Sequence, residues 1–171
     1  VFTQRKNVTR ARNLTLMEPP DFKGAREAIA PALKDPSTQN LPNTWHVAGM
    51  IGYKQNEAFY KEMALGKQVD FVKKGEAIIE SIDYFLKAYE LDQNQVDRKG
   101  RPVKPKFEAD IKAKLKEYFE EKHNLFYYGA TLFDEKKDYK GALKGFERYL
   151  SIPEIPFMKG VVTIDSTFYR S

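Results

Sequence analysis

The sequence predicts an all-α fold, an α-solenoid of about three stacked helix pairs with unusually long helices in the second and third pairs. Three observations predict it. Apolar residues recur at helical spacing along most of the chain, one short pattern returns three times, and prolines stand near the ends of the periodic segments. Strand-like alternation is confined to residues 160–164, in the C-terminal tail.

The internal repeat is clearest between its first and third copies. Residues 21–25, Asp-Phe-Lys-Gly-Ala, return as residues 138–142, Asp-Tyr-Lys-Gly-Ala, and Ser81 takes the position of Ala25 and Ala142 in a middle copy. Apolar side chains follow the small residue at intervals of four, which is one stripe of an amphipathic helix. We expect the small residue to lie where two helices touch.

The ends of the repeated helices carry recognisable signals. Asp21 and Asp138 each precede an aromatic residue and a lysine, which suits an N-cap or a first-turn acid. Pro36 and Pro153 are expected to end their helices, because proline is common just past a helix C-terminus.

Further helices are expected before each copy. Residues 3–17 predict a shorter helix, and residues 44–65 and 107–136 predict longer ones, since their apolar residues keep a period near 3.6 without an interrupting proline. The predicted helix pairs span residues 3–36, 42–93 and 107–153, followed by a linker or the start of a further repeat at residues 154–171.

The excess positive charge of the chain equals the charge of one segment. Lysine and arginine number 29 against 24 acids, a net charge of +5, and Arg98–Lys106 holds five basic residues and no acid. One interpretation is a solvated connector between helices. The other is a nucleic-acid contact that neutralises phosphates. The segment holds no aromatic residue for stacking on bases, which favours the connector and makes nucleic acid an unlikely partner.

The sequence predicts no catalytic, cofactor or metal site, and therefore a protein that is not an enzyme. There is no cysteine, and the two histidines, His46 and His123, fall in different repeats. No nucleophile stands with a base, and no glycine-rich loop precedes a lysine and a hydroxyl residue to hold phosphate. No membrane span is expected, because the longest uncharged stretch, residues 37–53, contains several polar side chains.

Two regions resemble the tetratricopeptide repeat. Its signature is an aromatic residue, then Leu-Gly, an aromatic, Ala, an aromatic, Ala and Pro, with 34 residues per repeat. The chain offers Trp45 followed by Ala48-Gly49, and residues 124–133 followed by residues 138–153. In the middle unit about twenty extra residues separate the two halves, so both helices must be longer than the family norm.

The resemblance implies a binding groove, because the first helix of each tetratricopeptide pair lines the concave face. We therefore expect a protein or peptide partner. The groove residues implied by this geometry are His46, Met50 and Tyr53 in the second unit and Asn124, Tyr127 and Thr131 in the third. The family's carboxylate-binding clamp needs lysines and asparagines in these places, where this chain has only scattered polar residues, so we do not expect capture of a C-terminal carboxylate.

A closer resemblance is to exported tetratricopeptide proteins of the Bacteroidetes type. The segments that carry it are residues 11–14, 20–22, 44–49, 66–68, 84–93 and 104–106. It implies the N-terminal region of a longer periplasmic or cell-surface scaffold, whose signal peptide is absent from this chain. The alternative is a glycan- or ligand-binding component of an outer-membrane uptake system. Asp165-Ser166-Thr167 resembles an O-glycosylation acceptor of such proteins, with a plain linker as the other interpretation.

Overall fold

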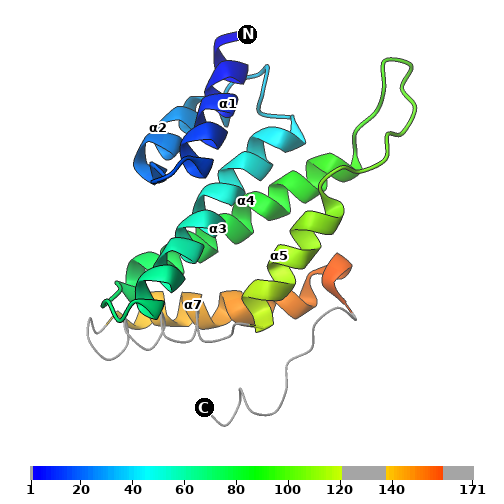
Figure 1. Ribbon diagram of the computed structural model, residues 1–171. Helices are drawn as coiled ribbons and strands as arrows, with labels where there is room; N and C mark the ends of the chain where they lie inside the picture. The colour runs from blue at the N-terminus through cyan, green and yellow to red at the C-terminus, as the bar shows by residue number, and fades with distance from the viewer. Residues whose placement is uncertain (1, 121–137, 160–171) are drawn as a thin grey trace. The chain divides into compact units, whose positions relative to one another are not determined.

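The computed structural model describes residues 2–120 and 138–159. In this part of the chain the regular structure is helical, which confirms the all-α prediction (Figure 1). The helices are α1 (Phe2–Leu16), α2 (Phe22–Ala32), α3 (Pro42–Ala64), α4 (Phe71–Gln93), α5 (Glu108–Glu120) and α7 (Tyr139–Ser151), with 3₁₀ turns η1 (Ile152–Glu154) and η2 (Pro156–Met158). The chain divides into two compact units, residues 1–69 with 80–109 and residues 70–79 with 110–171.

Helix α2 begins with the predicted cap. The Oδ1 atom of Asp21 accepts the backbone N–H of Gly24 at 2.9 Å, which satisfies one of the unpaired donors of the first turn. Gly24 leaves room for this cap, since a Cβ atom there would lie 2.4 Å from Oδ2 of Asp21.

The predicted end of the same helix is wrong. Helix α2 ends at Ala32, four residues before Pro36, and the chain continues in turns. The residue before a proline is disfavoured in the helical conformation, so Asp35 cannot extend the helix up to Pro36. Asp35 instead accepts the N–H of Ser37 at 2.8 Å through its side chain, closing a local turn.

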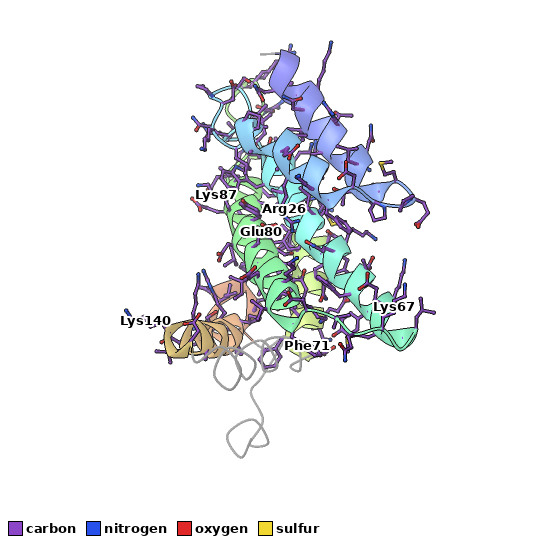
Figure 2. The ribbon with its side chains drawn as sticks, turned by 90° about the vertical axis from the view of Figure 1, so that its left-hand side faces the viewer. Arg26, Lys67, Phe71, Glu80, Lys87 and Lys140 are labelled. Atoms are coloured by element: carbon purple, nitrogen blue, oxygen red, sulfur yellow. The ribbon has the colours of Figure 1, made fainter. Side chains whose placement is uncertain are left out.

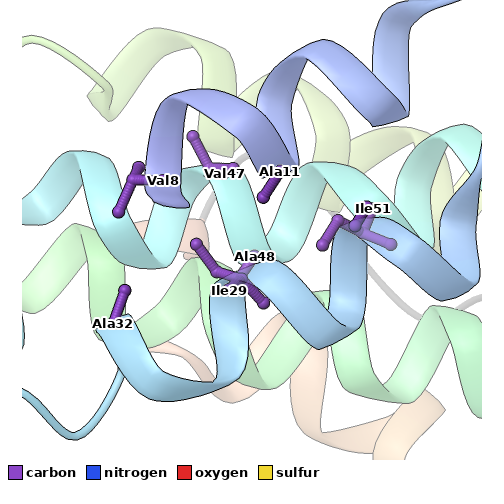
Figure 3. Packing of buried hydrophobic residues seen from close by; sticks show 8 residues of the cluster. Val8, Ala11, Ile29, Ala32, Val47, Ala48 and Ile51 are labelled. Atoms are coloured by element: carbon purple, nitrogen blue, oxygen red, sulfur yellow. The ribbon is translucent and has the colours of Figure 1, made fainter. Parts of the chain in front are cut away.

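The core of the first unit lies where α3 packs against both α1 and α2 (Figure 3). All three helices contribute small or branched apolar side chains, which allow the helices to approach closely. The buried cluster consists of Val8, Ala11, Ala25, Ile29, Ala32, Val47, Ala48 and Ile51.

Helices α3 and α4 are each 23 residues long, which confirms that both helices of the middle pair are extended. Within the first unit, α3 and residues 80–93 of α4 lie side by side (Figure 1), and Oγ of Ser81 donates a hydrogen bond to the carbonyl of Gly49 at 2.9 Å. A Cβ atom on Gly49 would lie 2.5 Å from the ring of Phe85. The close approach of α3 and the second half of α4 therefore requires a glycine at position 49.

A polar contact links three helices of the same unit. Nε of Arg26, on α2, lies 3.2 Å from a carboxylate oxygen of Glu80 on α4 (Figure 2), and the same guanidinium donates to the side-chain amide of Gln55 on α3. Burial raises the pKa of Glu80 from its ordinary value of 4.5, and the charge of Arg26 opposes this rise only in part.

The third copy of the repeat lies in the second unit and matches the first. Oδ1 of Asp138 accepts the N–H of Gly141 at 2.9 Å, so the second predicted cap is confirmed. The three equivalent small residues are all buried, with exposed fractions of 0% for Ala25, 0% for Ser81 and 2% for Ala142. Helix α7 ends at Ser151 and Pro153 follows it in a 3₁₀ turn, as predicted.

Parts of the sequence predictions lie outside the described residues. The predicted helix over residues 107–136 is observed as α5 up to Glu120, and the remainder falls in residues 121–137. The strand-like segment at residues 160–164 and the Asp165-Ser166-Thr167 motif also lie outside. None of the described helices combines the length and the apolar character needed to cross a membrane.

Candidate partner-binding groove

The larger cavity of the first unit lies between the start of α1, the start of α3 and the segment that joins α4 to α5. Its volume is about 610 Å³. Four separate segments of the chain supply its walls. The lining residues are Arg5, Val8 and Thr9 from α1, Thr38, Leu41, Pro42 and Asn43 around the start of α3, Asp92, Gln95 and Val96 at the end of α4, and Val103, Lys104, Lys106 and Phe107 beyond it.

A smaller cavity of about 200 Å³ adjoins the larger one, since Asn43 and Phe107 line both. Its other walls come from α1 and α3, and they include His46 and Met50, two of the residues predicted for the groove. The full lining is Arg12, Thr15, Leu16, Asn43, His46, Val47, Met50 and Phe107. We call the two adjoining cavities together the α1–α3 groove.

Phe107 is held in the groove wall by an aromatic contact. Its ring stacks on the imidazole of His46, with centroids 4.5 Å apart and planes 26° apart. His46 also contacts Phe85 of α4, at a centroid distance of 5.7 Å. These contacts explain how the residue that immediately precedes α5 comes to close one side of the groove.

The backbone before α5 is fixed by the buried carboxylate of Asp92. Its Oδ1 accepts the N–H of Lys106 at 3.0 Å and its Oδ2 accepts the N–H of Phe107 at 2.8 Å. The exposed fraction of Asp92 is 2%. Among the described residues Asp92 is the only acid that lines the larger cavity, and both of its oxygens are already occupied by backbone donors.

The basic segment folds into a narrow hairpin. An isolated bridge joins Val96 and Pro102, and Gly100 turns the chain with a φ of 76°. The carboxylate of Asp97 accepts the N–H groups of Lys99 and Arg101 and the Arg101 side chain, at 2.8–2.9 Å. These hydrogen bonds, above all the one from the Arg101 backbone, lower the pKa of Asp97. Arg101, one of the five basic residues of this segment, is therefore paired with an acid within the hairpin.

Positive charge collects at the groove. Arg5, Lys104 and Lys106 line the larger cavity and Arg12 lines the smaller one. Within residues 2–120 and 138–159, none of these four side chains forms an ion pair. The groove therefore presents cations that no described carboxylate of the chain neutralises.

The start of α3 adds to the positive electrostatic potential of the groove. Leu41 occupies the N-cap position and provides no side-chain acceptor for the first turn, and Pro42 follows it. Both residues line the larger cavity. The positive end of the helix dipole is thus left uncompensated by a capping side chain on the cavity wall.

The predicted site residues divide into three groups. His46 and Met50 both line the smaller cavity, and their role in binding a partner stays a prediction. Tyr53 is half-buried on α3 but lines neither cavity. The predicted groove residues of the third unit, at positions 124, 127 and 131, lie outside the described residues.

Sequence reasoning missed the contributions of Arg5, Arg12, Asn43 and Phe107. The interpretation of the basic segment as a solvated connector also did not anticipate that Lys104 and Lys106 line the same cavity as residues of α1. The sequence did contain a signal for this site, because residues 2–17 carry four basic residues and no acid. Acidic residues elsewhere in the chain offset part of the positive charge of that helix and the basic loop, so the net charge of the chain does not reveal these cations.

In the described residues, no group of three or more histidines, cysteines or acids is arranged to hold a metal ion. Comparison with protein-family models, with curated proteins and with solved structures finds no match. The assignment of function therefore depends on the groove and on the residues that line it.

Proposed function

We propose that this chain is a non-catalytic protein–protein interaction module of the tetratricopeptide type, the N-terminal region of a longer exported scaffold. In this proposal the α1–α3 groove is the partner-binding surface. The observation that carries it is that α1 and α3, the first helices of successive pairs, both line the groove. That is the arrangement by which tetratricopeptide proteins form their concave face.

The repeat register supports the same proposal. Asp21 and Asp138 form the same cap with the glycine three residues on, at the same 2.9 Å distance. The equivalent small residues Ala25, Ser81 and Ala142 are all buried. Packing of α3 against both helices of the preceding pair is also what stacked helix pairs require.

Glycan binding, the alternative function, has less support from the described aromatic residues. A sugar-stacking platform needs an aromatic face open to the ligand. The indole N–H of Trp45 donates to the carbonyl of Gln39 at 2.7 Å, and its ring packs against Tyr84 at a centroid distance of 5.9 Å. Phe107 uses one face to stack on His46. These rings are engaged within the fold.

Photo-crosslinking in the producing cells tests the proposal. Benzoylphenylalanine replaces Met50 or Arg12, which line the smaller cavity, and Lys67, which is exposed and lines neither cavity (Figure 2), serves as the matched control. We expect discrete adducts with a partner protein from positions 50 and 12 and none of those adducts from position 67. Identical adduct patterns at all three positions would contradict the proposed surface. Cell fractionation of the same strains tests the periplasmic or cell-surface location.

A further inference from the structure

We infer that the α1–α3 groove recognises a partner segment in which acidic side chains adjoin a large apolar side chain. The carboxylates occupy the larger cavity beside Arg5, Lys104 and Lys106, and the apolar side chain occupies the smaller one. This inference rests on the proposed function and adds the chemistry of the partner.

The cations of the larger cavity come from two segments that are far apart in the sequence. Arg5 lies on α1, whereas Lys104 and Lys106 lie almost one hundred residues later, in the connection between α4 and α5. The Asp92 hydrogen bonds to the backbone at positions 106 and 107 fix where this connection lies. Since the connection is held in place, the two lysines are a built part of the cavity wall.

The charge balance of the cavity favours an anionic occupant. Three cations face one acid among the described residues, and Asp92 has no oxygen free of backbone donors. Carboxylates that enter would form charge-assisted hydrogen bonds, which are stronger than neutral ones. The apolar side chains of Val8, Leu41 and Val103 also line this cavity and would contact the apolar atoms of such a partner segment.

The adjoining smaller cavity has an apolar part beside Arg12, the one cation among its described lining residues. Leu16, Val47, Met50 and the ring of Phe107 form much of its lining, and Leu16 is 52% exposed. A large apolar side chain would bury this surface, and the unbranched Met50 can adapt to its shape. Because Asn43 and Phe107 border both cavities, one extended segment can place side chains in each.

Nucleic acid fits this site less well. Base stacking needs an open aromatic face among the cations, but residues 98–106 contain no aromatic residue and Phe107 is stacked on His46. The three cations also share the cavity lining with the apolar side chains of Val8, Leu41 and Val103, which a phosphodiester backbone has no apolar groups to cover. An acidic protein segment matches both the charge and the apolar walls.

The test uses fluorescence anisotropy with short labelled peptides whose ends are blocked, so that no terminal charge takes part. The acidic probes contain Asp-Glu-Glu-Leu-Leu or the reverse order, and the neutral probes contain Asn and Gln in place of the acids. We expect an acidic probe to bind about tenfold more tightly than its neutral counterpart, and its affinity to fall as salt is added.

Two triple variants provide the matched comparison. Arg5→Gln with Lys104→Gln and Lys106→Gln should weaken the acidic probe about tenfold, as loss of complementary charge predicts. Lys23→Gln with Lys34→Gln and Lys67→Gln removes the same charge from exposed positions that line neither cavity, and should leave binding within about twofold. Both variants should melt within about 2 °C of the parent chain, because exposed charges contribute little to stability.

The outcomes separate this inference from the proposed function. Equal binding of acidic and neutral probes, lost on Met50→Ala, would overturn the charge inference and leave the groove as the partner surface. No salt-dependent binding of either acidic probe would also overturn the inference, while crosslinking at position 50 would still decide the proposed function. Tighter binding of a single-stranded oligothymidine than of the acidic probes would assign the cations to nucleic acid and overturn it.

Discussion

The imidazole of His46 stacks on the ring of Phe107, with centroids 4.5 Å apart. His46 lies on the second turn of α3, and Phe107 is the last residue before α5. This contact and the hydrogen bonds from Asp92 hold the end of the basic segment against the first unit. The stacked pair therefore connects the helix pairs to the loop that supplies two of the groove's cations.

Replacing Phe107 by alanine should destabilise the chain and loosen this connection. Phe107 is half-buried, so we expect a loss of about 2 kcal/mol in the free energy of unfolding, measured by urea denaturation. Phe107→Leu keeps apolar bulk but loses the ring contact, and should cost about 1 kcal/mol. If the alanine variant unfolds at the same urea concentration as the parent, the ring does not anchor the segment.

Gly49 should not tolerate a side chain. Alanine favours a helix by about 1 kcal/mol over glycine, but its Cβ would lie 2.5 Å from the ring of Phe85. We therefore expect Gly49→Ala to lower the free energy of unfolding by about 1–3 kcal/mol. Phe85→Leu in the same chain should restore part of this loss, and a double-mutant cycle measures the coupling. Additive effects would contradict the close approach of α3 and α4.

The repeat register predicts that substitution of Ala25 and of Ala142 destabilises the chain to the same extent. Each is buried at the position where a neighbouring helix is expected, so substitution by leucine should cost about 1–3 kcal/mol through overpacking. Leu143→Ala is the control, because Leu143 is 57% exposed and its loss should change stability by less than about 0.5 kcal/mol. An Ala142→Leu variant as stable as the parent would show that the register is wrong.

Loss of Arg26 should destabilise the chain more at neutral pH than in acid. The pKa of Glu80 is raised above 4.5 in the folded chain, so ionisation costs stability as pH rises through 4.5 and the folded-state value. Arg26→Ala removes the opposing charge, and we expect a cost of about 1–3 kcal/mol at neutral pH that shrinks below pH 4.5.

Other carboxylates titrate in the same range, so the comparison needs a reference without the Glu80 carboxylate. In a Glu80→Gln background, the cost of Arg26→Ala should no longer change with pH. Urea unfolding of the four chains at both pH values gives this difference directly. A pH-dependent cost that persists in the Glu80→Gln background would assign the effect to another group.

The sequence predicted the structural features that are determined by residues close together in the chain. Asp21 and Asp138 could be recognised as caps because the cap bond spans three residues. The end of α2 was misjudged because Asp35 forms a local turn before Pro36. Both the caps, which were predicted correctly, and the end of α2, which was not, depend on residues that lie within a few positions of one another in the sequence.

The groove was only partly predictable, because its walls depend on tertiary packing. The family resemblance implies His46 and Met50 as groove residues, and both line the smaller cavity. Nothing local links Arg5 to Lys104, since the buried carboxylate of Asp92 and the ring of Phe107 bring the loop to α1. A charge sum over the whole chain hides this arrangement.

Amide NMR shift mapping during titration with the acidic–apolar peptide tests whether the α1–α3 groove is the partner-binding surface. We expect the largest shift changes at residues 5–16, 41–50 and 103–107, which contain most of the groove lining. Changes centred on exposed residues 61–68 at the far end of α3, with residues 5–16 unaffected, would show that the partner binds elsewhere.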